Sequence, residues 1–387
     1  MRFPFRLLPR SVLCVCVAPT PIHYVSAAGS HTPPFTSWAT AATNIQAAID
    51  ASETPDTILI ASGTYTSPGV ARNGTNVFVL DKDVEIWGEP GTVIDGQGMM
   101  RGACLLNGMA RNLIFKNGVA STIEGVENSG RGGGVWLENA ELVSCLISEN
   151  HAELKGGGVY TFGGTIKNCT IADNSADEQA GGLLADVFID IPMMGTSPIR
   201  IVGESLVRNS IIQQNEAPAY ANYFDKNRWL FPSSSPPTYS ACCLNPLPIG
   251  GTGNMTNSPA FRADGDYRLS PDSPCINSGS NQRWMSGSID LDQKPRILYG
   301  TVDMGAYEFF ESLTITHFSA GNAQSTWTTL PGAVYQLQAC DDLSTAEWVN
   351  IGSPVTATTT ELSASDSTAA DHRFYRVILT EWPAEEE

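Results

Sequence analysis

Acidic side chains recur at a fixed spacing in the middle of the chain and could bind a metal ion. Glu149 and Asp173 lie 24 residues apart, and so do Glu153 and Asp177. If this interval is one turn of a repeat, the four carboxylates form two columns on one edge. Like charges so placed raise one another's pKa or attract Ca²⁺, which prefers oxygen ligands. The sequence suggests a calcium site, with a solvated loop edge as the alternative.

Lysines near this edge suggest a reaction. Lys155 or Lys167 could remove the C5 proton of a uronate sugar that a bound cation acidifies, which is β-elimination in an acidic polysaccharide. Other signs of catalysis are missing, because the five histidines form no motif and the one adjacent aspartate pair, Asp341-Asp342, lies near the C-terminus. We expect binding without catalysis, and keep a polysaccharide lyase or glycoside hydrolase as the alternative.

Two aromatic residues share the same spacing. Trp136 and Tyr160 each follow a valine, and if Val135 and Val159 point inward, alternation turns the rings outward. Exposed stacked rings suit the apolar faces of sugars. The sequence predicts a ligand-binding face at this ring pair, or else two rings packed beneath an overlying loop.

A repeat of 24 residues positions these side chains. The segment GGGVW at residues 132–136 recurs as GGGVY at residues 156–160, and GGL at residues 181–183 continues the register. Self-similarity at a fixed period predicts a solenoid, because a coil this short buries its inner face only by stacking on its neighbours. We expect an all-β fold, a right-handed parallel β-helix.

Looser copies flank the repeat. LIFKN at residues 113–117 and IIQQN at residues 211–215 both match LISEN at residues 146–150, and the longer interval before Ile211 predicts an insertion at residues 188–204. Asparagines end these segments, and we expect them to form a hydrogen-bonded ladder rather than a ligand site. They are Asn117, Asn150, Asn174 and Asn215. Cys145 and Cys169 share another column, which we expect to be a core stack rather than a disulfide.

Both ends of the solenoid carry further elements. The spacing of Ile45, Ala48 and Ile49 predicts an amphipathic helix within residues 41–51, which would cap the first coil. Short alternating segments predict a small β-sandwich module at residues 311–380, followed by an acidic tail at residues 381–387.

The repeat region resembles known families. ILIASGTY, VEIWG and TVIDG, followed by the GGGV coils, resemble the pectate-lyase-like superfamily of parallel β-helix proteins over residues 41–310. GGGV with IxxN is also similar to the repeats of chlamydial polymorphic outer-membrane proteins, which are surface adhesins. NSPAF at residues 257–261 and TVDMGAYEF at residues 301–309 resemble the choice-of-anchor Q region of exported bacterial β-helix proteins, here at about residues 240–310. These resemblances imply an adhesin-like, surface-binding role, although the NTD, GHG and RIK motifs of polygalacturonases are absent.

The N-terminus predicts export. Residues 1–27 combine three arginines, a short apolar run and a small-residue triplet, the layout of a signal peptide, and residues 28–40 would be a linker. We expect a secreted or cell-surface monomer without a transmembrane segment in the mature chain. The net charge of −18 disfavours nucleic acid as a partner. The expected partner is a polysaccharide or another cell-surface component.

Overall fold

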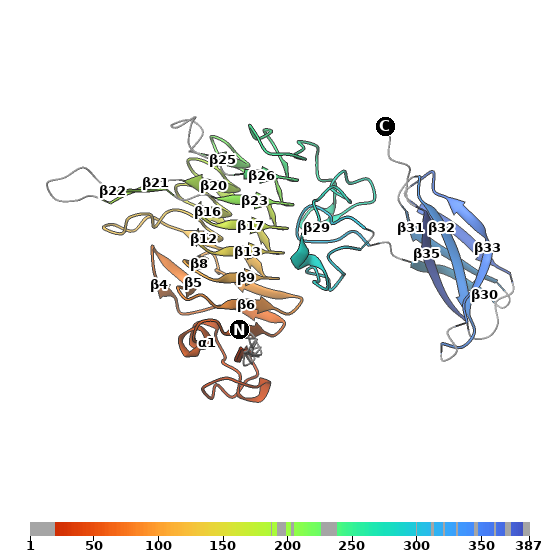
Figure 1. Cartoon of the computed structure of the whole chain (residues 1–387), viewed down its shortest axis with the longest axis horizontal. Helices are drawn as coiled ribbons and strands as arrows, with labels where there is room; N and C mark the ends of the chain where they lie inside the picture. The colour runs from red at the N-terminus through yellow and green to blue at the C-terminus, as the bar shows by residue number, and fades with distance from the viewer. Residues whose placement is uncertain are drawn as a thin grey trace, which may run out of the picture.

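Stacked parallel strands form the body of the molecule (Figure 1). The computed structural model describes residues 20–186, 188–191, 199–202, 205–225, 238–298, 300–310, 313–319, 322–329, 332–343, 347–359, 361–367 and 373–381. The central coils each contribute one strand to each of three long sheets, which we name A, B and C, and three coils add a strand to a short sheet D; at the start of sheet C, β4 and β5 of one coil form an antiparallel pair. The structure therefore confirms an all-β fold with a parallel β-helix, while its right-handed sense stays a prediction.

Within each sheet the strands follow one another in coil order along the solenoid. Sheet A contains β1 (Ile22–Val25), β2 (Thr57–Ile60), β6 (Glu85–Gly88), β9 (Met109–Arg111), β13 (Glu141–Val143), β17 (Thr165–Lys167), β23 (Leu206–Arg208) and β26 (Thr238–Ser240). Sheet B contains β3 (Gly63–Tyr65), β7 (Thr92–Asp95), β10 (Ile114–Lys116), β14 (Leu146–Ser148), β18 (Thr170–Ala172), β24 (Ile211–Gln213) and β27 (Cys243–Leu244). Sheet C contains β4 (Val70–Ala71), β5 (Thr75–Leu80), β8 (Arg101–Leu105), β12 (Val135–Glu138), β16 (Val159–Phe162), β20 (Leu183–Asp186) and β25 (Tyr223–Asp225). Sheet D contains β11 (Val119–Ala120), β15 (His151–Ala152) and β19 (Ser175–Ala176).

The register of sheet C confirms the 24-residue period. Val135 pairs with Val159, which pairs with Leu183. The next interval in sheet B is longer, because Ile171 pairs with Ile212. The extra residues include the antiparallel hairpin of β21 (Phe188–Ile191) and β22 (Ile199–Val202), which projects from the solenoid in Figure 1 and confirms the predicted insertion.

Alternate residues of each strand fill the interior. One column of sheet B consists of Phe115, Ile147, Ile171 and Ile212, all fully buried. Glycines let neighbouring coils approach closely, since a Cβ added at Gly158 would meet the carbonyl oxygen of Gly182 at 2.8 Å. Burial of apolar surface between coils, rather than within one coil, therefore stabilises the solenoid.

A helix covers the first coils, in agreement with the predicted cap. The helix α1 (Ile45–Ala51) begins at Asn44, whose side chain accepts a hydrogen bond from the Ala47 N–H at 2.9 Å. Ile45, Ala48 and Ile49 are buried, and α1 contacts β1, β2 and β5.

The solenoid begins earlier in the sequence than predicted. Strand β1 lies within the predicted signal peptide, yet Val25 is fully buried in the core and His23 bonds to Asp56 at 2.9 Å. Cleavage after Ala27 would remove this strand and the bond from His23 to the buried Asp56, so that boundary does not fit the fold. Residues 28–40, predicted to be a linker, pack on the first coil through buried Phe35 and contain the short 3-10 helix η1 (Trp38–Thr40). Residues 1–19 lie outside the described residues, and export itself stays a prediction.

The parallel coils also end earlier than predicted, at the bridge between Cys243 and Met255. Residues 256–310, which we call the appended segment, fold back along the solenoid (Figure 1). They contain the hairpin β28 (Phe261–Ala263) and β29 (Asp266–Leu269) and the 3-10 helix η2 (Arg283–Met285). The Ala306 N–H donates to Thr170 Oγ1 at 3.0 Å, and the Gly305 N–H donates to the Asn209 carbonyl at 2.7 Å.

Two three-stranded antiparallel sheets follow, as the sequence predicts for a small sandwich. One sheet contains β30 (Leu313–Ser319), β31 (Asn322–Thr328) and β34 (Glu361–Asp366), and the other β33 (Val349–Thr356), β32 (Val334–Cys340) and β35 (Phe374–Glu381). Trp327 and Tyr335, one from each sheet, belong to one buried apolar cluster. Within the described ranges no helix has the length and apolar character needed to cross a bilayer.

Candidate functional site: a cleft between the solenoid and the appended segment

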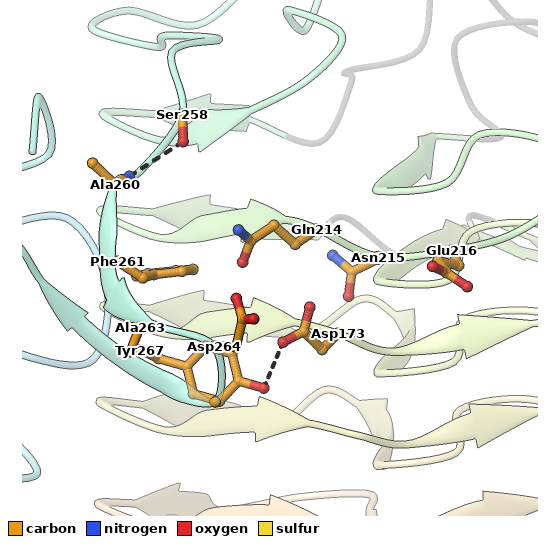
Figure 2. Close-up of a pocket in the computed structure, with 11 residues that line it drawn as sticks. Asp173, Gln214, Asn215, Glu216, Ser258, Ala260, Phe261, Ala263, Asp264 and Tyr267 are labelled. Carbon is orange, nitrogen blue, oxygen red and sulfur yellow. Dashed lines mark hydrogen bonds between the residues drawn. The ribbon is translucent and has the colours of Figure 1, made fainter.

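A cleft of about 570 Å³ lies between the edge of the solenoid and the hairpin β28–β29 (Figure 2). Its lining combines carboxylates, amides and aromatic rings. The lining residues are Asp173, Gln214, Asn215, Glu216, Ser258, Ala260, Phe261, Ala263, Asp264, Gly265 and Tyr267. Ligand sites typically combine a concave surface with a few convergent polar groups, and this cleft has both features.

The solenoid wall of the cleft is built on a column of sharp bends. Directly after sheet B, the residues Asn117, Glu149, Asp173 and Gln214 all have left-handed backbone angles, with φ between 53° and 60°. Asparagine and aspartate tolerate this conformation better than most residues. We call these four residues the bend column; it exposes at least the side chains of Glu149, Asp173 and Gln214 on successive coils.

A buried asparagine ladder supports the bend column from beneath. The Asn150 amide donates to Oδ1 of Asn174 at 2.9 Å, and the Asn174 amide donates to Oδ1 of Asn215 at 3.0 Å. The ladder confirms the prediction for these three residues and extends to Asn222. The prediction is wrong for Asn117, because Phe115 pairs with Ile147, which puts Gly118 opposite Asn150 and Asn117 opposite Glu149.

The opposite wall comes from the appended segment. The Tyr267 hydroxyl donates to Oδ2 of Asp173 at 2.9 Å, and the Phe261 ring meets the Tyr267 ring edge-on with centroids 5.5 Å apart. Burial, followed by the bond to Asp173, raises the pKa of Tyr267, which keeps the hydroxyl protonated as a donor. A bidentate ion pair between Arg268 and Asp292, with Nη2 and Oδ1 2.7 Å apart, holds the same hairpin.

The four acidic residues predicted to bind calcium do not converge. Glu149 pairs with Lys116 at 2.9 Å, and Asp177 lies 3.7 Å from His151. Glu153 accepts two hydrogen bonds from Thr122, which lower its pKa, and Asp173 accepts the Tyr267 bond. In the part of the chain that the structure describes, no group of three or more His, Cys, Asp or Glu side chains could hold a metal ion. The predicted four-carboxylate cluster is therefore not formed, because neighbouring coils and, for Asp173, the appended hairpin give each acid its own partner.

The two lysines predicted as candidate bases lie elsewhere. Lys155 is 3.7 Å from Glu178, and Lys167 projects from sheet A, where it bonds to Glu141 at 2.9 Å. Neither lines the cleft. The structure does not bring them together with the acidic residues in the way β-elimination requires.

The predicted ring pair is stacked but not exposed. Trp136 and Tyr160 pair in sheet C, with ring centroids 4.5 Å apart, yet they are only 1% and 3% exposed. The guanidinium groups of Arg101 and Arg131 lie over these rings, and Leu184 packs in the same cluster. The prediction of an exposed ligand-binding face is wrong here, because arginines and neighbouring apolar side chains cover the rings.

A second, shallower pocket of about 530 Å³ continues the same edge of the solenoid. It is lined by Asp95, Gln97, Gly98, Asn117, Gly118, Val119, Glu149 and His151. Within the bend column Glu149 lines this pocket and Asp173 lines the cleft, and the Glu149 N–H donates to the Asp173 carbonyl. On sheet D, Ser175 lies between His151 of one pocket and Glu216 of the other. The two pockets therefore form one polar face along the solenoid.

Ser175, His151 and Asp177 on this face have the residue types of a hydrolytic triad. Ser175 Oγ is 3.0 Å from His151 Nδ1, and Asp177 Oδ2 is 3.7 Å from His151 Nε2. Acyl transfer also needs free N–H groups at the oxyanion. The N–H groups of Ser175, Ala176 and Asp177 all donate to carbonyls of adjacent coils. We therefore interpret the contact between His151 and Ser175 as a side-chain hydrogen bond between neighbouring strands of sheet D, and not as part of a catalytic triad.

Comparisons with known proteins give no family for this chain. No protein-family model matches, and no curated protein matches. Among solved structures, one described as the crystal structure of pectate lyase Pel9A is similar at 13% sequence identity, covering 76% of this chain and 97% of that chain, with a TM-score of 0.21. The fold assignment rests on the strand pairing itself, and the similarities to choice-of-anchor Q and polymorphic outer-membrane proteins stay predictions.

Sequence reasoning does not reveal the cleft. The sequence draws attention to Asp173 only as an acidic residue. It draws attention to Phe261 and Tyr267 only as parts of the segment at about residues 240–310 that resembles the choice-of-anchor Q region. No local pattern connects them, since Asp173 and Tyr267 are 94 positions apart. One sequence signal could have indicated the solenoid wall of the cleft, namely the polar residue directly before each ladder asparagine: Glu149, Asp173 and Gln214.

Proposed function

We propose that this protein is an exported β-helix scaffold that binds an uncharged carbohydrate chain in the cleft and along the polar face next to it. The observation that carries the proposal is the composition of the lining. Carboxylate and amide oxygens accept hydrogen bonds from sugar hydroxyls, and amide N–H groups donate to them. The half-buried Phe261 ring supplies the apolar contact that the faces of a sugar require, and the buried Tyr267 ring packs edge-on against it.

The charge of the cleft selects against acidic polymers. Asp173, Glu216 and Asp264 line it, and none of the described residues in its lining is a lysine or an arginine. A uronate carboxylate in this site would face like charges at close range without a compensating cation. A neutral polysaccharide or glycan therefore fits better than the acidic polysaccharide that the lyase hypothesis assumes.

Cell-surface binding belongs to the same proposal. A glycan on a cell surface would reach an exported protein, and the solenoid presents its pockets on successive coils, so that a linear chain can contact several of them. The adhesin-like role and the extracellular location rest on the N-terminal segment and on the family resemblances.

The test is a binding titration of the full chain against neutral polysaccharides and, in parallel, polyuronates, with product analysis in every sample. We expect saturable binding to a neutral polymer that Phe261→Ala weakens at least tenfold. Phe374→Ala is the matched control, since this ring is 44% exposed on the sandwich, away from the cleft. Binding confined to polyuronates, or equal affinity of the Phe261→Ala variant, would overturn the proposal.

A glycoside hydrolase is the second candidate, and one observation favours it. Glycosidases act through two carboxyl groups that flank the scissile bond, and three carboxylates line this cleft. New reducing ends in the product analysis, lost in Glu216→Gln or Asp264→Asn while binding persists, would establish hydrolysis. Unsaturated uronate products would instead establish the lyase, for which the described lining of the cleft supplies no cationic base.

A further inference from the structure

Two cysteines meet where the last coil contacts the appended segment. Cys243 lies in β27, the last strand of sheet B, and Cys275 lies in the appended segment. Both are fully buried in one apolar cluster with Ile211 and Met304.

Backbone hydrogen bonds fix both cysteines. The Cys243 N–H donates to the Ser210 carbonyl at 2.9 Å, and the Met304 N–H donates to the Cys275 carbonyl at 3.0 Å. The two thiols lie close enough for each to shift the pKa of the other, and Cys243 Sγ also lies 3.1 Å from the Asn257 carbonyl oxygen. In the folded state the neighbouring Cys275 lowers the pKa of Cys243.

A second cysteine pair shows what distinguishes this contact. Cys145 and Cys169 also lie in contact, but they occupy matching positions on adjacent parallel coils. Strand spacing sets their Cβ atoms about 4.8 Å apart, beyond the roughly 3.8 Å typical of a disulfide. Cys243 and Cys275 belong to different elements, so no strand ladder fixes their separation.

We propose that Cys243 and Cys275 form a disulfide that joins the last coil to the appended segment. The oxidant is an external disulfide, such as an oxidised dithiol protein. The Cys243 thiolate attacks one sulfur of that bond, the external S–S bond breaks, and its other sulfur leaves as a thiolate. Cys275, deprotonated, then attacks the mixed disulfide, forms the Cys243–Cys275 bond and releases the second external sulfur. The external disulfide gains two electrons and the two protons that the cysteines lose.

The bond would form during folding, before the appended segment buries both sulfurs. Once formed, it holds in place the segment that carries Phe261 and Tyr267, and with it one wall of the cleft. The proposal does not depend on the ligand, because it concerns the covalent state of the free protein.

The test is a thiol count and peptide map of the full chain refolded in an oxidising glutathione buffer. Of the nine cysteines in the full chain, we expect seven to react with a thiol reagent in denaturant, and Cys243 and Cys275 to appear in one linked peptide. A linkage between Cys145 and Cys169 in place of the one between Cys243 and Cys275, or all nine thiols free, would overturn the proposal.

Reduction provides an independent readout. We expect dithiothreitol to lower the melting temperature of the wild type by several degrees, as loss of a loop-closing disulfide does. The Cys145→Ser/Cys169→Ser variant should keep this fall, and the Cys243→Ser/Cys275→Ser variant should lose it. If a variant does not fold, the peptide map of the wild-type protein still decides the question.

Discussion

The Tyr267 hydroxyl donates a 2.9 Å hydrogen bond to Oδ2 of Asp173, and this bond joins the two walls of the cleft. Asp173 belongs to a coil in the middle of the solenoid, whereas Tyr267 belongs to a hairpin that follows the last coil. The separation of the walls therefore depends on a contact between distant parts of the chain.

Removing this hydroxyl should loosen the cleft. A hydrogen bond to a charged group contributes about 1.5–3 kcal/mol to stability, and because only part of this is transmitted to the ligand, we expect Tyr267→Phe to raise the Kd for a neutral glycan about threefold to tenfold. Tyr375→Phe is the matched control, because the Tyr375 hydroxyl donates to Asp366 at 3.2 Å in the sandwich. Isothermal titration of both variants checks this, and an equal loss in both would contradict it.

The asparagine ladder should dominate the stability of the central coils. Asn174 makes three hydrogen bonds through its Nδ2 and accepts two more from Asn150. Asn174→Ala leaves several buried groups unpaired, and we expect it to lower the free energy of unfolding by about 3 kcal/mol. Asn117→Gly, outside the ladder and at φ 53°, should cost less than about 1 kcal/mol. Urea denaturation measures both, and similar costs would count against the ladder.

Replacing Trp136 should lower the stability of the fold and leave ligand affinity unchanged. Because its ring is buried, we expect Trp136→Ala to lower the free energy of unfolding by about 3–5 kcal/mol. The Kd of the folded variant for a neutral glycan should equal that of the wild type. A weakened Kd with unchanged stability would restore the exposed-face interpretation.

The docked appended segment should make stability depend on pH. Arg296 pairs with Glu308 at 3.0 Å, while Asp290 and Asp303 are buried nearby. Burial raises the pKa of Asp303 to about 7 and also raises those of Asp290 and Glu308. The folded state therefore binds protons more tightly than the unfolded state, and stability falls as pH rises from about 4 to about 9, with the contribution of Asp303 lost between about pH 4 and 7.

Asp303→Asn isolates this contribution. The amide oxygen can replace only one of the two carboxylate oxygens, which accept the N–H bonds of Asn277 and Phe309, so the variant carries a pH-independent loss of stability, but its side chain no longer titrates. We expect the melting temperature of the wild type to fall relative to that of the variant between pH 4 and 7, by the equivalent of a few kcal/mol. Parallel curves for the two proteins would show that Asp303 does not carry the effect.

Calcium should have little effect on stability. Glu149, Glu153 and Asp173 would each have to leave a hydrogen bond or ion pair to coordinate the ion together. We expect equal melting temperatures in EDTA and in millimolar calcium chloride. A rise in calcium that disappears in Asp173→Ala/Asp177→Ala would revive the predicted calcium site.

The fold is predictable where chemistry repeats along the chain. Equal spacing of Val135, Val159 and Leu183 is visible in the sequence and becomes strand pairing directly. The sequence alignment puts Asn117 opposite Asn150, which is wrong by one residue, because in the structure Gly118 lies opposite Asn150. The coil before the regular repeats is longer than 24 residues, and the alignment matches asparagine to asparagine. Strand β1 escapes prediction because an apolar β-strand and the end of a signal peptide have similar composition.

The site is less predictable than the fold, for a physical reason. Side-chain exposure depends on what covers a strand, and alternation alone does not reveal that Arg101 and Arg131 lie over the ring pair. Register places the carboxylate columns correctly, but their partners come from neighbouring coils and from the hairpin.

The matching registers at Val135, Val159 and Leu183 make residues 156–179 an interchangeable unit. Both its neighbours already accept the same strand positions, so a tandem duplication of this unit would insert one more coil with the same strand pairing in sheet C on either side. Each copy would lengthen the polar face by about 4.8 Å, the distance between strands. Gene duplication would therefore change the length of the polar face in steps of one coil.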